Sequence, residues 1–101
     1  MASRLKLQNE LEELLGSRFV YYQPPESIRL NYPCIVYTRK RIEKDNADDT
    51  WYLKYHNYEL TLIDPNPDSE LVDKLCNLSM CKHVNHFTSD SLNHDVFSLY
   101  Y

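Results

Sequence analysis

The sequence predicts a single α+β domain over residues 1–101, in which two helices pack a mostly antiparallel twisted sheet with a long projecting β-hairpin. Two segments carry apolar residues at helical spacing, and the other apolar segments are rich in tyrosine and β-branched residues. Turn-forming residues separate these segments. The predicted order of elements is α-β-β-β-α-β-β, and a chain of 101 residues has the length of one domain.

The first predicted element is a helix over residues 3–15. Four leucines at three- and four-residue spacing form one apolar stripe; they are Leu7, Leu11, Leu14 and Leu15. Ser3 suits the N-cap, and Gly16, which is the single glycine of the chain, suits the position just after the helix. We expect this helix to cover one face of the sheet.

The second element is a short strand followed by an extended arm. Residues 18–22 are aromatic and β-branched, which is typical of a strand. The arm, residues 23–33, contains Pro24, Pro25 and Pro33, and proline cannot join the central ladder of a sheet. A connection of this length in a small domain is long enough to contact a partner.

The segment 34–63 predicts a long antiparallel hairpin. The strand 34–43 starts apolar and ends charged, which indicates that it begins in the core and runs out into solvent. Residues 44–50 form a polar, acidic turn region. Both faces of the strand 51–63 are partly apolar, so we expect it to be covered on two sides or to carry a bulge near Asn57.

The last predicted elements are a second helix over residues 67–78 and two strands within 82–101. Asn66 suits the N-cap of the helix and Pro67 its first position. Its apolar face is formed by Leu71, Val72, Leu75, Cys76 and Leu78. The end of the chain is too apolar for a frayed tail, so we expect it to be paired in the sheet or against a partner.

Composition argues against several classes of protein. The net charge of -4 disfavours a dedicated nucleic-acid binder, which normally needs a basic surface. No apolar run approaches the ~20 residues that span a bilayer, and the N-terminal residues lack the apolar stretch of a signal peptide. We therefore expect no membrane partner and synthesis in the cytoplasm. Three cysteines, an odd number, disfavour a secreted disulfide framework.

The chemical signals in the chain are weak. Cys76, Cys81, His83 and His86 are zinc-ligand types, but Cys-x4-Cys-x-His-x2-His is not a standard spacing, and Cys76 falls on the apolar helix face. We interpret this segment as a buried thiol and surface histidines, and a zinc-stabilised module is the alternative. Cys34 opens a core strand with no nearby glycine to build an oxyanion hole. We expect no cofactor and no enzymatic activity.

The positive signals are aromatic residues, the proline-rich arm and the charged hairpin, which are features of a chain that binds other proteins. Nine tyrosines fit half-buried sheet positions and contact surfaces. Arg39-Lys40-Arg41 alternate faces on a strand and so form no single phosphate-binding patch. The predicted interface residues are Gln23, Pro24, Pro25, Glu26 and Arg29 in the arm, Arg39, Arg41, Asp45, Asn46, Asp48 and Asp49 in the hairpin, and Tyr100 and Tyr101 at the C-terminus.

Three sequence blocks carry a resemblance to a known group of proteins. They are Tyr32-Pro33-Cys34-Ile35-Val36-Tyr37, Asp64-Pro65-Asn66-Pro67-Asp68-Ser69 and Leu92-Asn93-His94-Asp95-Val96-Phe97. With these blocks the chain, from about Arg18 to Tyr101, resembles the small tail completion or tail terminator (head-tail joining) proteins of long-tailed phages. The resemblance implies a twisted sheet with flanking helices and a projecting hairpin, and it carries over no catalytic residue.

The resemblance also implies a function and partners. Tail terminators form a ring, commonly six-membered, at the head-proximal end of the tail tube, where they stop tube growth. The expected partners are further copies of the chain, the tail tube protein and a neck or connector protein, and DNA would pass through the lumen without specific binding. The expected location is the virion, after assembly in the host cytoplasm. The alternatives are a neck or head-closure protein and a small regulatory binding protein outside the virion.

Overall fold

Two helices and a five-stranded mixed sheet form the described part of the chain, which confirms the predicted α+β class and element order. The computed structural model describes the backbone of residues 4–47, 50–78 and 80–101, and the side chains of these residues outside 43–55. The elements are α1 (Arg4–Leu15), β1 (Val20–Tyr22), β2 (Cys34–Ala47), β3 (Thr50–Asp64), α2 (Glu70–Cys76), β4 (Cys81–Ser89) and β5 (Leu92–Tyr100).

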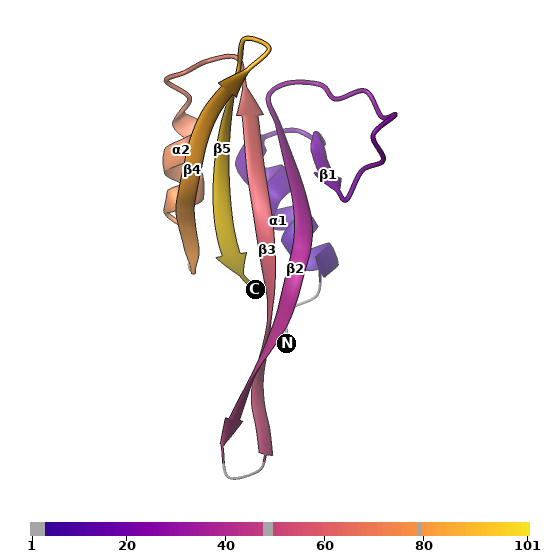
Figure 1. Cartoon of the computed structure of the whole chain (residues 1–101), viewed down its shortest axis with the longest axis vertical. Coiled ribbons are helices and arrows are strands. Elements are labelled where there is room, and N and C mark those ends of the chain that lie inside the picture. The colour runs from indigo at the N-terminus through magenta and orange to yellow at the C-terminus, as the bar shows by residue number, and fades with distance from the viewer. Residues whose placement is uncertain (1–3, 48–49, 79) are drawn as a thin grey trace.

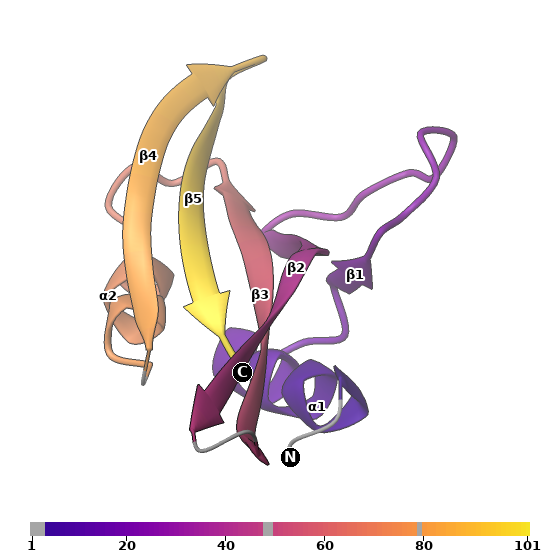
Figure 2. The same ribbon diagram turned by 60° about the horizontal axis from the view of Figure 1, so that its bottom comes forward.

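The strands lie in the order β1-β2-β3-β5-β4. All neighbours are antiparallel except β1 and β2, which run parallel because the arm 23–33 carries the chain back before β2 begins. Both helices lie on the same face of the sheet, as Figures 1 and 2 show. We refer to the two sides of the sheet as the helix face and the open face.

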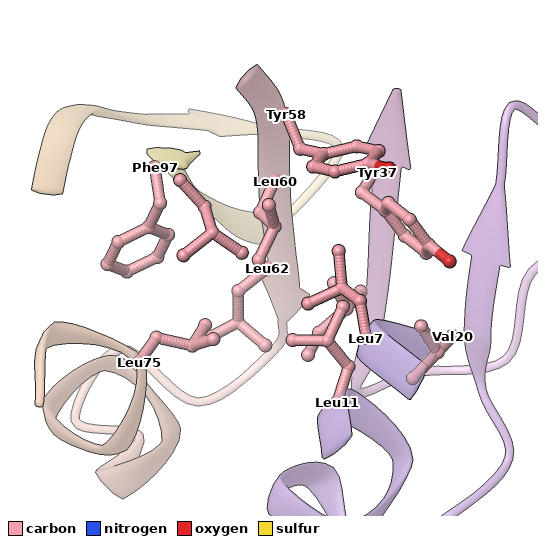
Figure 3. Close-up of a cluster of buried hydrophobic side chains, with 11 residues drawn as sticks. Leu7, Leu11, Val20, Tyr37, Tyr58, Leu60, Leu62, Leu75 and Phe97 are labelled. Atoms are coloured by element: carbon pink, nitrogen blue, oxygen red, sulfur yellow. The ribbon is translucent and has the colours of Figure 1, made fainter. Parts of the chain in front are cut away.

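The hydrophobic core lies between the helices and the helix face. Tyr37, Leu60 and Phe97 are register partners across β2, β3 and β5, and all three are fully buried. Figure 3 shows Leu7 and Leu11 of α1 pointing toward the same cluster. The complete cluster is Leu7, Leu11, Val20, Ile35, Tyr37, Tyr58, Leu60, Leu62, Leu75, Phe97 and Leu99.

Three tyrosines join α1 to the strands. The rings of Tyr22, Tyr37 and Tyr58 lie 4.9 to 6.4 Å apart, centroid to centroid. The Tyr37 hydroxyl donates to Oε1 of Gln8 at 2.5 Å, and the Arg4 guanidinium lies 4.4 Å from the Tyr22 ring centroid. Burial raises the pKa of Tyr37 and of Tyr58, so both hydroxyls stay neutral at physiological pH.

The predicted end of the first helix is confirmed. Gly16 has φ +81°, a left-handed conformation that glycine adopts without steric cost, and its N–H donates to the Glu12 carbonyl at 2.9 Å. The stripe faces the core, since Leu7 and Leu11 are buried and Leu14 and Leu15 pack against the cluster. The predicted N-cap, Ser3, lies outside the described residues.

The predicted start of the second helix is wrong by three residues. The helix begins at Glu70, and the side chain of Ser69 caps it by accepting from the Leu71 N–H at 3.2 Å. Asn66 instead accepts from the Asp68 N–H at 3.0 Å, and Asp64 accepts from the Asn66 N–H at 2.8 Å. Asn66 thus makes the hydrogen bond expected of an N-cap, but the turn at 67–68 does not continue into the helix, because Ser69 is extended with φ -62° and ψ 130°.

The end of the second helix also differs from the prediction. The helix ends at Cys76, and Asn77 forms its C-cap. Leu75 is buried, and Leu71, Val72 and Leu78 pack against the core as the apolar pattern predicted. Cys76, which was predicted to lie on the apolar face, is exposed because the helix ends there before another element covers it.

The central hairpin is longer than predicted and carries a bulge. Residues 44–47, predicted as a turn, belong to β2. Arg39 pairs with Tyr58 and Arg41 with Asn57, so Lys40 is an extra residue in β2. One of the two expectations for the strand 51–63 was a bulge in that strand near Asn57. The bulge lies opposite Asn57, but the extra residue is in the partner strand β2. Bulges increase local twist, and Figure 1 shows β2 crossing β3 where the hairpin leaves the body.

The C-terminal strands form a tight hairpin. Asp90 and Ser91 have φ of +52° and +63°, the backbone of a two-residue turn that matches the twist of the strands. The backbone of Tyr101 exchanges two hydrogen bonds with that of His56, at 3.0 and 3.1 Å. The apolar end of the chain is therefore paired in the sheet, as predicted.

Replacing Leu11 with alanine should destabilise the protein by about 2–5 kcal/mol, because Leu11 is fully buried and its loss leaves a cavity. The matched control is Leu5→Ala on the same helix. Leu5 is 65% exposed, so this change should alter stability by no more than about 0.5 kcal/mol. Urea unfolding of both variants measures the difference. Equal losses would show that α1 is not packed on the sheet as described.

Candidate protein-contact surfaces

The predicted interface residues do not form one patch. The molecule is elongated, with extents of 51 × 26 × 22 Å. Figure 1 shows the hairpin at one end of the long axis and the arm toward the other. Asp45 and Asn46 lie in β2, but their side chains are outside the described part of the chain, as are Asp48 and Asp49 altogether. The structure therefore separates the predicted contact residues into distinct surfaces.

The arm is anchored to β2 at its first residue. The Gln23 N–H donates to the Tyr37 carbonyl at 2.9 Å, and Oε1 of Gln23 accepts from the Arg39 N–H at 3.4 Å. Farther along, Pro25, Glu26 and Arg29 are exposed, and Pro24 is half-buried. The predicted arm residues are thus presented to solvent on a segment whose start is fixed to the sheet.

The arm also covers part of the open face. A hollow of about 330 Å³ lies between the arm and strands β2 and β3. It is lined by Pro24, Pro25, Glu26, Ile28, Leu30, Val36, Thr61 and Ile63. Cys34 and Ile63 are register partners with 0% and 7% exposure, and they face away from the helix-face residue Leu62. The strand 51–63, expected to be covered on two sides, is covered in this way over its last residues.

The base of the hairpin connects to the C-terminus. A guanidinium N–H of Arg41 donates to the Tyr100 hydroxyl at 3.1 Å, so two predicted interface residues meet. Lys40 pairs with Glu59 at 3.6 Å. Because of the bulge, Lys40 and Arg41 lie on the open face with Glu59 and Asn57, while Arg39 lies on the helix face. The three cations do not alternate as predicted, although they still form no single patch.

The Tyr101 side chain makes a hydrogen bond within the chain. Its hydroxyl donates to a carboxylate oxygen of Glu10 in α1 at 2.9 Å. Loss of solvent around the hydroxyl, followed by the hydrogen bond to Glu10 and its negative charge, raises the pKa of Tyr101 to about 12. This residue, predicted to contact a partner, ties the end of β5 to α1.

The outer edge of β4 was not predicted as a contact surface. Every residue of β4 except Cys81 is exposed, and β5 pairs with only one of its edges. Its exposed side chains include Val84 at 58% and Phe87 at 44%. Edge strands are commonly protected from pairing with another chain by charged side chains and by proline. β4 has Lys82 as its one lysine or arginine and contains no proline. The near-absence of charge in 81–89 was visible in the sequence.

Two of the candidate zinc ligands join a carboxylate instead. One carboxylate oxygen of Asp95 is hydrogen-bonded to Nε2 of His83 at 3.1 Å and to Nδ1 of His86 at 2.8 Å. A bulge between His83 and Asn85 lets residues three apart share a face. Among the described side chains, those of residues 4–42, 56–78 and 80–101, no group of three from His, Cys, Asp or Glu is placed to hold a metal ion.

An apolar groove of about 720 Å³ lies beside α1 on the helix side of the molecule. Leucines of α1, Leu78 and Met80 after α2, and the end of β5 line it. Met80 is 52% exposed, so the groove is open to solvent at this residue. The sequence pattern predicted the apolar faces of the two helices, but it did not predict the space between them.

Loss of solvent raises the pKa of two of the three thiols. Burial raises the pKa of Cys34 to about 11, and burial followed by the nearby Cys76 raises the pKa of Cys81 to about 11. The thiolate is the nucleophilic form, so neither group is activated for catalysis at physiological pH.

No protein-family model matches the sequence, and a comparison with curated proteins finds no match. The resemblance to tail terminators therefore depends on the three sequence blocks alone. Among the helices of the described residues, none is long and apolar enough to cross a membrane.

The three cysteines should react with iodoacetamide at different rates in the folded protein. Cys76 is exposed and should be labelled first, Cys81 is partly buried and should follow, and Cys34 should be labelled last. Peptide mass spectrometry at about pH 8, with urea-unfolded protein as the control, measures the order. Equally fast labelling of Cys34 and Cys76 would contradict the burial of Cys34.

Alkaline pH should lower stability through Cys34. Its folded pKa of about 11 lies above the ordinary value of 9.0, so the folded state retains a proton that the unfolded state releases. The stability that the folded state gains from keeping Cys34 protonated is fully present below pH 9.0 and is lost as pH rises through about 11. Urea unfolding across this range should show a shallower loss for Cys34→Ala than for the unchanged protein. Parallel curves would show that Cys34 is not the group responsible.

Proposed function

We propose that this chain is a structural virion protein that forms a ring at the head-proximal end of a phage tail tube. There it ends tube growth and joins the tail to the head, without a chemical reaction. The observation that carries this proposal is the combination of open sheet edges and a projecting hairpin in one small domain. The sequence blocks described above supply the link to phage tails.

Two open edges lie on opposite sides of the same sheet. No described strand pairs with the outer edge of β4, which has nine residues. On the other side, β1 pairs only with residues 35–37 of β2, and no other described strand pairs with the outer edge of β2 beyond them. Unpaired backbone at a sheet edge is a template for pairing with another chain. Different edges on opposite sides support head-to-tail association, which closes into a ring when the rotation between copies is suitable.

The projecting hairpin supports contact beyond the ring. A tube of stacked rings grows because each ring presents unsatisfied edges and loops to the next one. A terminator would satisfy those groups on one side and present a different surface on the other. The hairpin lies at one end of the long axis and the arm lies toward the other, and the two suit contacts with the tail tube protein and with a neck or connector protein.

The charge of the chain fits a lumen that DNA crosses without binding. The net charge is -4 at pH 7, and like charges repel DNA from a wall instead of holding it. The location that follows from the proposal is the virion, at the tail or neck, after assembly in the host cytoplasm.

Quantitative mass spectrometry of purified phage particles tests the proposal. We expect this chain in the particles at a fixed, small copy number that matches one ring per tail. Purified tube protein should retain the chain more strongly than purified connector protein does, since a terminator caps the tube. Stronger retention by connector protein would instead indicate a neck protein. Absence from the particles would refute a structural role in the virion.

A further inference from the structure

The groove beside α1 has a specific chemical character. Its apolar lining includes Leu7, Leu11 and Leu14 of α1, and Met80 forms an exposed part of the opposite side. Figure 3 shows α1 and α2 next to each other on the helix face, with Leu7 and Leu11 pointing to the core from α1. The groove is open to solvent and large enough to receive several side chains.

The charges at the groove are negative. Glu10 and Glu13 are the charged residues among the described residues that line it. The Glu10 carboxylate accepts from the Tyr101 hydroxyl, while Glu13 is exposed. An occupant that complements this groove therefore has an apolar side chain next to cations.

The base of the hairpin carries this combination. Ile42 is 42% exposed and follows Arg39, Lys40 and Arg41 in the sequence. Ile42 pairs with His56 and Arg39 with Tyr58, and both of these β3 residues have the parity of the helix face. The bulge at Lys40 thus places Arg39 and Ile42, three residues apart, on the same side of the hairpin.

The hairpin cannot supply this side chain to the groove of its own chain. Ile42 pairs with His56, and the backbone of His56 pairs with that of Tyr101 at the groove, so two strand spacings of about 4.8 Å each separate Ile42 from Tyr101. The Ile42 side chain is too short to cross this distance. Leu5 is also exposed and lies between Arg4 and Lys6, but Arg4 is bound to Tyr37 and Tyr22 within the chain. The charge pattern and the separation of Ile42 from its own groove therefore favour a second copy of this chain as the occupant.

We infer that the groove beside α1 binds the base of the hairpin of a second copy, with Ile42 entering the groove and Arg39 facing Glu13. This inference rests on the proposed ring, for which it names the contact between neighbouring subunits. The two surfaces are different, so each copy offers its hairpin to one neighbour and its groove to the other.

Two variants test the contact from its two sides. Ile42→Asp places a charge on the hairpin, and Met80→Asp places one in the groove. Both side chains are exposed, so the fold should persist. Met80 has φ +60°, a conformation that aspartate adopts more readily than most residues. Circular dichroism and thermal melting verify folding. In analytical ultracentrifugation, each change should weaken self-association at least about tenfold, because each removes an apolar anchor.

Mixing the two variants gives the sharpest result. The Met80→Asp chain retains a working hairpin and the Ile42→Asp chain a working groove, so an equal mixture should form a heterodimer and nothing larger. Leu5→Asp is the matched control, since Leu5 is more exposed than Ile42 and does not line the groove. It should leave self-association unchanged.

A charge exchange tests the pairing of Arg39 with Glu13. Arg39→Glu should weaken self-association, and Glu13→Arg in the same chain should restore it. The effect should shrink as salt rises, because salt screens exposed ion pairs.

The outcomes separate this contact from the proposed function. A monomer at all concentrations would overturn the inference, as would oligomers that both variants leave intact or a mixture without heterodimer. If oligomers persist in both variants while the chain is found in particles at ring copy number, the ring stands and only this contact is wrong. If the chain is absent from the particles, the virion role fails whatever the variants show.

Discussion

The packing of Tyr22, Tyr37 and Tyr58 is the interaction on which the rest of the structure depends. These rings come from β1, β2 and β3, and the Tyr37 hydroxyl bonds Gln8 of α1, so one cluster holds four elements together. Arg4 adds a cation above the Tyr22 ring. The cluster lies where the hairpin leaves the body, since the residue paired with Tyr58, Arg39, directly precedes the bulge. The aromatic cluster therefore packs directly beside the bulge at which the hairpin leaves the body.

The helices leave much of the sheet uncovered. α1 has twelve residues and α2 seven, and both lie on one face, while the arm lies over part of the open face. The edge strand β4 is exposed along almost its whole length. A small domain normally limits exposed apolar side chains and free edges because they promote association. The proposed ring uses the uncovered edge, the groove and the hairpin of this chain. The surfaces that the helices leave uncovered are therefore the surfaces that the proposed contacts would bury.

Local patterns predicted the elements well and their junctions poorly. The leucine spacing and Gly16 placed the first helix and its end correctly, because the stripe and the left-handed stop are properties of adjacent residues. The second helix starts later than predicted, because the extended backbone of Ser69 interrupts the turn that Asn66 caps. The bulge was expected near Asn57, but pattern alone did not show that β2 would carry the extra residue. The predicted contact residues are divided between the arm, the hairpin, and the C-terminus at the base of the hairpin, and the β4 edge was not among them.

The sequence by itself determined the α+β class, the order of elements and the two apolar helix faces, because spacing and turn chemistry act between residues close in the chain. Tertiary structure alone decided that β1 runs parallel to β2, that β4 lies at the outer edge, and that Asp95 is hydrogen-bonded to His83 and His86. It also decided where the groove lies relative to the hairpin. These features depend on which distant segments pair and on the space that remains between packed helices. Local periodicity specifies neither the pairing nor the space.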